Sequence, residues 1–280
     1  LGTVMSNLAA LGVGRLVPIS VIGDDGHSRD LVNELRRLPV ELAHLLHDRE
    51  WLTPTYTKPM RREANGAWRE LNRLDVRSRQ PLSPATLQRT LAALETVWST
   101  ADGLIVLDQV PEEGWGVVSP VVRERLAQWA AALPGKLMFV DSRMHVHCFS
   151  AGVLKPNRAE CLQGARLADS ATQAELEAAV SAWATRTGSP VFCTLGADGI
   201  LLAEPGAAPC LVPGVPAVGP IDVVGAGDSA TAGIVAARLA GATWMEAAVV
   251  GNLVASITVE QLGTTGTATP QQVLDRWGRF

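Results

Sequence analysis

Several features that would mark other classes of protein are scarce in this 280-residue sequence. None of its four cysteines stands in a C-x-x-C pair, so a zinc or dithiol site has little support and a reducing cytoplasm fits. The formal net charge is only -4, which gives no reason to expect nucleic acid or a membrane surface as a partner. No uninterrupted apolar run is long enough to span a bilayer.

Two common nucleotide-binding motifs are also missing. No G-x-x-x-x-G-K-[ST] occurs, which excludes a P-loop. No G-x-G-x-x-G follows the first predicted strand, so the fingerprint of a nicotinamide-dependent reductase is absent from the sequence as given.

What is present is an alternation of short β-type runs and longer helical stretches. The strands are mostly continuous apolar runs, as expected of a parallel sheet covered by helices on both faces. The predicted strands are Arg15–Ile22, Leu104–Leu107, Leu137–Val140, Gly152–Lys155 and Val191–Leu195. The predicted helices are Ser28–Arg37, Pro84–Trp98, Val117–Leu133, Thr172–Arg186, Asp228–Ala240 and Trp244–Gln261. We therefore predict one α/β domain over residues 1–280, with a three-layer α/β/α arrangement.

One segment, residues 53–76, departs from this alternation. Two β-like pieces, Thr55–Met60 and Glu70–Val76, flank Ala64-Asn65-Gly66. Asn-Gly between extended runs is typical of a hairpin. The segment is expected to form a small β flap, or lid, beside the main sheet.

The most informative motif is Asp222-Val223-Val224-Gly225-Ala226-Gly227-Asp228, which precedes a helix of small residues. The two glycines permit a tight turn, and the free N–H groups and positive dipole end of the next helix favour an anion there. Asp228 lies in the first turn of that helix. It could be a base facing the anion, or simply the capping residue of an ordinary glycine-rich turn.

This motif resembles the C-terminal D-T-x-G-A-G-D signature of the PfkB (ribokinase-like) carbohydrate kinases, with Val223 in place of Thr. Other segments match the family in order. They are Gly23-Asp24-Asp25, the K-P-N-x-x-E element Lys155–Glu160, the T-x-G-x-x-G turn Thr194–Gly199, and Gly251-Asn252. The resemblance extends from about Gly2 to Gly266. It implies a ribokinase-like fold, with a further strand that would precede Leu1, and transfer of the ATP γ-phosphoryl group to a sugar hydroxyl.

The resemblance also implies roles for individual residues. Asp228 would be the general base, and the backbone N–H groups of Gly225, Ala226 and Gly227 would form the anion hole. Asn157 and Glu160 would organise Mg²⁺ through water. Thr194, Gly196 and Gly199 would line the nucleotide, with Asn252 near the adenine.

On the acceptor side, the flap resembles that of heptose-7-phosphate kinase domains, although Gln109 stands where those have Tyr. This likeness makes Asp25, Lys58 and Arg73 the candidates for contacts with a sugar or sugar phosphate, and a homodimer through the flap is expected. Two alternatives remain open. One is a kinase for a nucleoside or another non-sugar alcohol, and the other is a nucleotide-binding regulatory module without turnover.

Overall fold

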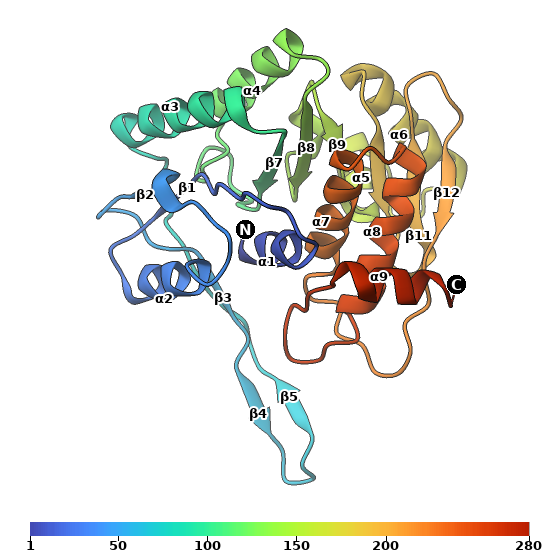
Figure 1. Cartoon of the computed structure of the whole chain (residues 1–280), viewed down its shortest axis with the longest axis horizontal. Helices are drawn as coiled ribbons and strands as arrows, with labels where there is room; N and C mark the ends of the chain where they lie inside the picture. The colour runs from blue at the N-terminus through green and yellow to red at the C-terminus, as the bar shows by residue number, and fades with distance from the viewer. Residues whose placement is uncertain (280) are drawn as a thin grey trace.

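A computed structural model describes residues 1–279 and shows a central six-stranded sheet between two layers of helices (Figure 1). The strands lie in the order β12-β11-β10-β9-β8-β7. Their bounds are β7 Gly103–Asp108, β8 Leu137–Ser142, β9 Val153–Leu154, β10 Val191–Thr194, β11 Gly199–Ala203 and β12 Cys210–Pro213. Strands β7 to β10 are parallel, and β11 and β12 add antiparallel at one edge.

Helices cover both faces of this sheet. The described helices are α1 Gly2–Ala10, α2 Gly26–Leu35, α3 Pro84–Thr100, α4 Pro120–Ala132, α5 Arg158–Ala165, α6 Gln173–Thr187, α7 Ala226–Leu239, α8 Trp244–Thr258 and α9 Pro270–Trp277. Short 3₁₀ turns lie at Leu42–His44, Val146–Cys148 and Gly196–Asp198. No helix among residues 1–279 combines the length and the apolar content needed to cross a bilayer.

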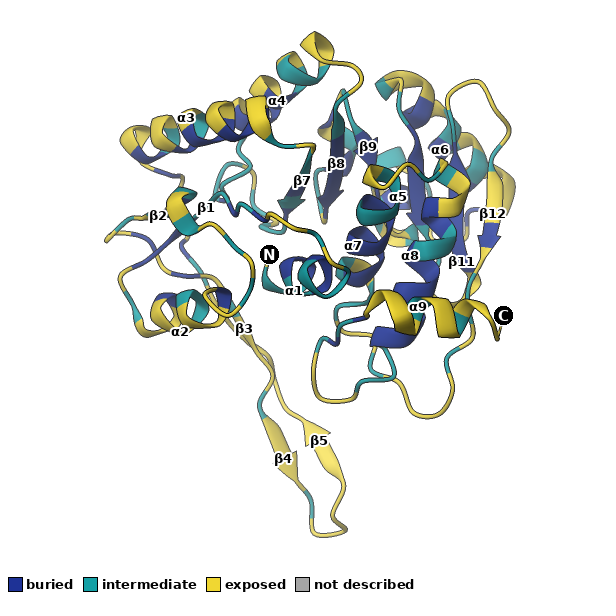
Figure 2. Ribbon diagram, in the orientation of Figure 1, coloured by how far each residue is buried: buried dark blue, intermediate teal, exposed yellow. Residues whose placement is uncertain are grey.

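The alternation of side chains along the strands creates two cores, one on each face. Val140 and Leu154 point to the face covered by α3, α4, α5 and α6. Their neighbours Phe139 and Val153 point to the face covered by α7 and α8, where Phe192 lies 6.0 Å from Phe139 between ring centroids. Figure 2 shows these strands buried and the outer helix faces exposed. The predicted three-layer α/β/α architecture is confirmed.

A smaller unit lies beside the sheet. Its strands β1 (Ser20–Ile22) and β2 (Leu45–His47) pair in parallel, and α1 and α2 pack against them. The predicted strand Arg15–Ile22 was therefore too long. Pro18 interrupts it, since a proline has no N–H for a ladder. Upstream of Pro18, only an isolated bridge joins Leu16 to Val40.

The flap forms as predicted and projects away from the body of the molecule (Figure 1). It is a two-stranded ribbon of four short strands, β3 Thr55–Thr57, β4 Met60–Arg62, β5 Trp68–Glu70 and β6 Leu74–Val76. Strand β3 pairs with β6, and β4 pairs with β5, both antiparallel. Gly66, at the tip, has a positive φ of 83°, the backbone conformation that the Asn-Gly pair favours.

Candidate functional site

The glycine-rich turn lies directly before α7. Gly225 has φ 84° and ψ 0°, a left-handed conformation that suits glycine. A Cβ at this position would lie 3.0 Å from Thr265 Cβ and 3.2 Å from Thr3 Cγ2, so a side chain would also crowd the turn. The turn thus requires glycine here for both conformation and space.

The donors of this turn differ in part from the prediction. The Ala226 N–H donates to the Val223 carbonyl at 3.1 Å, so it is already used inside the turn. Within residues 1–279, the backbone N–H groups of Gly225, Gly227 and Asp228 have no acceptor. An anion at the start of α7 would therefore meet the N–H groups of Gly225, Gly227 and Asp228, together with the positive end of the helix dipole.

Asp228 is the third residue of α7 and does not cap the helix, because the N-cap position is occupied by Gly225 and no side chain caps it. Burial raises the pKa of the Asp228 carboxyl, and the nearby Asp141 carboxylate raises it further, while Lys155 and Arg143 oppose the shift. A carboxyl group with a raised pKa beside free N–H donors is suited to accept a proton from a hydroxyl group.

A buried ion pair lies beneath the turn. Lys155, which directly follows β9, places its Nζ 2.9 Å from Asp141 Oδ2 at the end of β8. The Thr231 hydroxyl, from α7, donates to the same carboxylate oxygen at 3.0 Å. Burial disfavours the Lys155 charge, but the carboxylates of Asp141, Glu160 and Asp228 outweigh it and raise the lysine pKa. Together with the Thr231 hydroxyl, this pair joins two strand ends to α7.

Asn157 and Glu160 form a reciprocal cap at the start of α5. Asn157 Oδ1 accepts from the Glu160 N–H at 2.9 Å, and Glu160 Oε2 accepts from the Asn157 N–H at 2.8 Å. Glu160 Oε1 has no hydrogen-bond partner in the described part of the chain, and burial raises the pKa of this carboxyl. The two predicted magnesium residues are therefore adjacent, and one carboxylate oxygen remains available.

This donor set fits Mg²⁺ held mainly through water. Across residues 1–279, no group of three or more His, Cys, Asp or Glu side chains is arranged to hold a metal alone. Magnesium, however, is usually bound by one or two carboxylates, several waters and substrate phosphates. Three carboxylates, those of Asp141, Glu160 and Asp228, act on Lys155, and they outnumber the two nearby cations, Lys155 and Arg143. A divalent ion near Glu160 would offset the excess negative charge.

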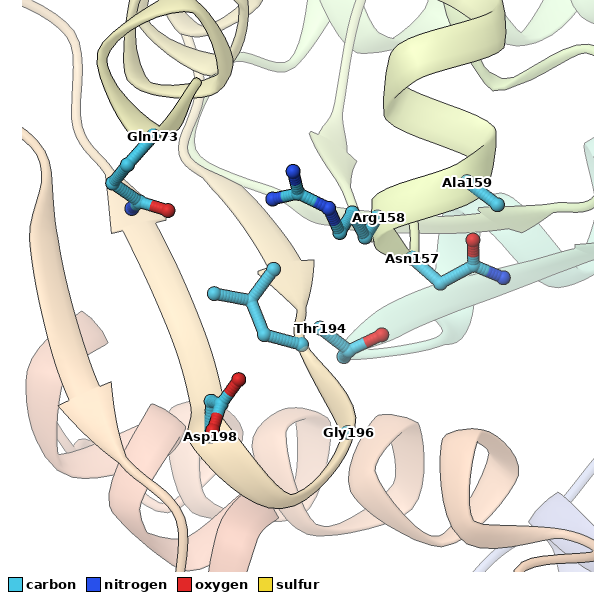
Figure 3. Close-up of a pocket in the computed structure, with 8 residues that line it drawn as sticks. Asn157, Arg158, Ala159, Gln173, Thr194, Gly196 and Asp198 are labelled. Atoms are coloured by element: carbon cyan, nitrogen blue, oxygen red, sulfur yellow. The ribbon is translucent and has the colours of Figure 1, made fainter. Parts of the chain in front are cut away.

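Two of the predicted nucleotide residues, Thr194 and Gly196, line one cavity of about 450 Å³ together with the predicted magnesium residue Asn157 (Figure 3). Asp198, for which no role was predicted, adds a carboxylate to the wall of this cavity. The Thr194 N–H donates to the Pro156 carbonyl at 2.9 Å, which holds the ends of β9 and β10 together. The parallel strands thus deliver these residues to one edge of the sheet, where open α/β sheets bind ligands.

The other two predicted nucleotide residues, Gly199 and Asn252, do not line this cavity but contact β12 next to it. Gly199 has φ 104°, and a Cβ there would lie 2.2 Å from the Val212 carbonyl oxygen. Asn252 is buried in α8, and its Nδ2 donates to the carbonyls of Val212 and Pro213 at 3.1 and 2.9 Å. Both residues fix β12 against the Thr194–Gly199 turn. The side-chain amide donors of Asn252 are thus already engaged with the backbone.

The predicted acceptor residues lie in the smaller unit and the flap. Asp25 caps α2 through the Ser28 N–H at 2.8 Å and accepts from the Thr53 N–H at 2.9 Å, which ties the flap base to the helix. Lys58 pairs with Glu70, and Arg73 pairs with Asp75, at 3.1 and 2.7 Å on the exposed flap. No hydrogen bond or ion pair joins any two of these three residues.

No role was predicted for two basic residues, Lys155 and Arg143, whose charges act on Asp228. Lys155 was seen only as part of the K-P-N-x-x-E element, and its burial could not be inferred from the sequence. Arg143 follows β8 and lies with its guanidinium carbon 5.9 Å from the centre of the Tyr56 ring on the flap. Its charge also acts on the carboxyls of Asp228 and Glu160. Its place after an apolar strand was the one available signal.

Several solved structures share this fold. Phosphofructokinase-2 from Escherichia coli in complex with potassium superposes with a TM-score of 0.74 at 19% identity, covering 99% of this chain and 85% of that one. Ribokinase from Arabidopsis thaliana complexed with ribose and ATP gives a TM-score of 0.69 at 19% identity, covering 97% and 85%. At these identities the similarity establishes the fold.

Comparisons of the sequence identify the family to which the chain belongs. The Bifunctional protein HldE of Caulobacter sp. (strain K31) is 34% identical over 266 residues, which cover 94% of this chain and 51% of that protein. The protein of the same name from Desulfatibacillum aliphaticivorans is 30% identical over 269 residues, covering 94% and 52%. The chain thus spans about half the length of the curated relatives it matches. Residues 2–272 match the family described as pfkB family carbohydrate kinase, and the chain belongs to that family.

Proposed function

We propose that this chain transfers the γ-phosphoryl group of ATP to a hydroxyl of a sugar or sugar phosphate, with Asp228 as the general base. The observation that carries the proposal is the position of Asp228. Its buried carboxyl, with a raised pKa, lies in the first turn of α7 beside the free N–H groups of Gly225 and Gly227. A base and an anion hole in one helical turn suit phosphoryl transfer, which depends on positioning and charge stabilisation.

The geometry supports a separate role for each part of the site. The cavity lined by Asn157, Thr194 and Gly196 would hold the nucleotide, with its phosphates directed toward the start of α7. Asp228 would take the proton from the acceptor hydroxyl, and the N–H groups of the turn would hold the charge on the transferred group. Bound Mg²⁺, held near Glu160 and Asn157, would supply charge neutralisation of the phosphates.

The acceptor would approach from the flap side of the sheet edge. Lys58 and Arg73 supply positive charge on the flap, each paired with a flap carboxylate, and Asp25 holds the flap base to α2. The flap exposes large apolar side chains, among them Trp68 at 64% and Leu74 at 58%. Such an exposed ribbon suits pairing with a second copy, so a homodimer through the flap is part of the proposal.

The test is ADP release from ATP and Mg²⁺ with a panel of sugars, sugar phosphates and nucleosides, using a protein that includes any sequence before Leu1. Turnover that depends on a sugar or sugar phosphate supports the proposal and identifies the acceptor class. Turnover only with nucleosides would assign a different acceptor class. Nucleotide binding without turnover on any acceptor would contradict kinase activity and favour a regulatory module.

A further inference from the structure

The Lys155 ammonium group lies beneath the anion hole and has more N–H donors than acceptors around it. Only 3% of the residue is exposed, and Asp141 Oδ2 is the single acceptor that residues 1–279 provide for its Nζ. A lysine ammonium group carries three N–H donors. Two donors of a buried charge are therefore not satisfied by the protein, which is costly unless another acceptor is bound nearby.

The location of Nζ indicates where that acceptor would be. A Cβ built on Gly227 would lie 3.7 Å from Nζ, so the ammonium group is next to the first turn of α7. This places a positive charge against the positive end of a helix dipole, beside the free Gly227 N–H. Two positive features of this kind repel each other unless they share an anion.

The surrounding carboxylates do not supply that shared anion at the turn. Asp141 already engages Lys155 from the β8 side, together with the Thr231 hydroxyl. Glu160 and Asp228 act on the lysine only through their charge, with no recorded hydrogen bond to it. A ligand oxygen at the start of α7 could accept from both Lys155 Nζ and the backbone donors of the turn.

We propose that Lys155 is a catalytic residue whose ammonium group donates hydrogen bonds to the transferred phosphoryl group. Asp141 and Thr231 act as positioning residues that hold Nζ at the base of the anion hole. Lys155 forms and breaks no covalent bond, and its proton stays on Nζ throughout. The inference rests on the proposed kinase function and assigns a contact of that same site.

The first test compares nucleotide affinities by calorimetry in the presence of Mg²⁺. The two ligands are ADP and the ATP analogue with an imido link between its β and γ phosphates. We expect Lys155→Met to weaken the analogue by about 10- to 100-fold, as lost charge-assisted hydrogen bonds do, while ADP changes by less than about threefold. Equal weakening of both ligands, or of neither, would overturn the proposal.

Lys136→Met is the matched control. Lys136 directly precedes β8, so it lies at the amino end of a strand, whereas Lys155 follows the carboxyl end of β9. The Lys136 Nζ lies 5.0 Å from the centre of the Trp98 ring. This control should leave both affinities and the turnover number unchanged. In Lys155→Met, kcat should fall by about 10²- to 10³-fold, the effect of losing one donor to a developing charge. Lys155→Arg should restore part of the analogue preference because it retains the charge.

Removing Lys155 could destabilise the chain by leaving Asp141 unpaired, so a second measurement uses the unmodified protein. The sequence contains three lysines, Lys58, Lys136 and Lys155, which makes ¹⁵N-detected NMR of the ammonium groups tractable. The Lys155 signal should shift on binding the imido analogue and stay near its original position with ADP. An identical response to both nucleotides would contradict the contact.

These measurements separate the inference from the function on which it rests. If the unmodified protein turns over an acceptor but Lys155 responds equally to both nucleotides, the lysine contact is wrong and the kinase stands. If the unmodified protein binds neither nucleotide, the proposed function itself fails.

Discussion

Replacing Asp141 by alanine tests the role of the buried ion pair in stability. Asp141→Ala removes the one acceptor that the described residues 1–279 provide for Lys155 Nζ, 2.9 Å away, and the acceptor of the Thr231 hydroxyl, 3.0 Å away. The ammonium group would remain buried without a partner, because its side chain is 4% exposed. Breaking a buried pair in this way typically costs about 3–5 kcal/mol, so the free energy of unfolding should fall by roughly that amount.

The assay is urea unfolding followed by tryptophan fluorescence, with a matched exposed pair as control. Glu41→Ala breaks the Arg15–Glu41 pair, whose side chains are 52% and 53% exposed, and should change the free energy of unfolding far less because solvent screens it. Replacing both buried partners, Lys155→Met with Asp141→Leu, should recover most of the loss. A loss below about 1 kcal/mol for Asp141→Ala would refute this reasoning.

Three further predictions concern the nucleotide turn, the base and the flap. Gly199→Ala, which forces a Cβ toward the Val212 carbonyl at a φ of 104°, should cost roughly 1–3 kcal/mol and weaken ADP binding, measured by urea unfolding and calorimetry. Because burial raises the pKa of Asp228, kcat/KM should decline with falling pH at values above those of an ordinary aspartate near 3.9; an acid limb at or below about 3.9 would contradict this. Trp68→Ser should shift a flap-mediated dimer toward monomer in light scattering, and an unmodified protein that is strictly monomeric would remove the dimer proposal.

The raised pKa of Asp228 also makes the free energy of unfolding depend on pH. Its raised pKa means that the folded state retains a proton that the unfolded state has already released. Stability from this group is therefore present at low pH and lost as the pH rises from the ordinary aspartate value through the raised one. Asp228→Asn should flatten that part of the pH–stability curve.

The sheet and most of its helices were predictable because strong local signals agreed with the global fold. The apolar runs at Leu104–Leu107 and Leu137–Val140 became β7 and β8, and the helix predicted over Pro84–Trp98 became α3. The Asn-Gly pair correctly marked the flap tip. The strand predicted over Arg15–Ile22 failed because its apolar pattern continued through Pro18, which cannot join a ladder.

Some of the residues selected from the sequence lie together in the structure, but their hydrogen bonds could not be predicted. The order of strands brought Asn157, Thr194 and Gly196, which the family resemblance had selected, to one cavity. The internal use of the Ala226 N–H and the burial of Lys155 depend on tertiary packing, which no local pattern encodes. The assignments of Asp25, Lys58 and Arg73 to the acceptor remain predictions.

The central claim is that Asp228 is the base of a phosphoryl transfer, and single-turnover kinetics with Asp228→Asn tests it most directly. The variant and the unmodified protein would be mixed with labelled ATP, Mg²⁺ and the acceptor identified by the panel, and phosphoryl transfer would be followed after rapid quenching. The variant should bind ATP with near-normal affinity but transfer the phosphoryl group at least about 10²-fold more slowly, which is the typical contribution of a general base. Transfer at an unchanged rate would contradict the claim.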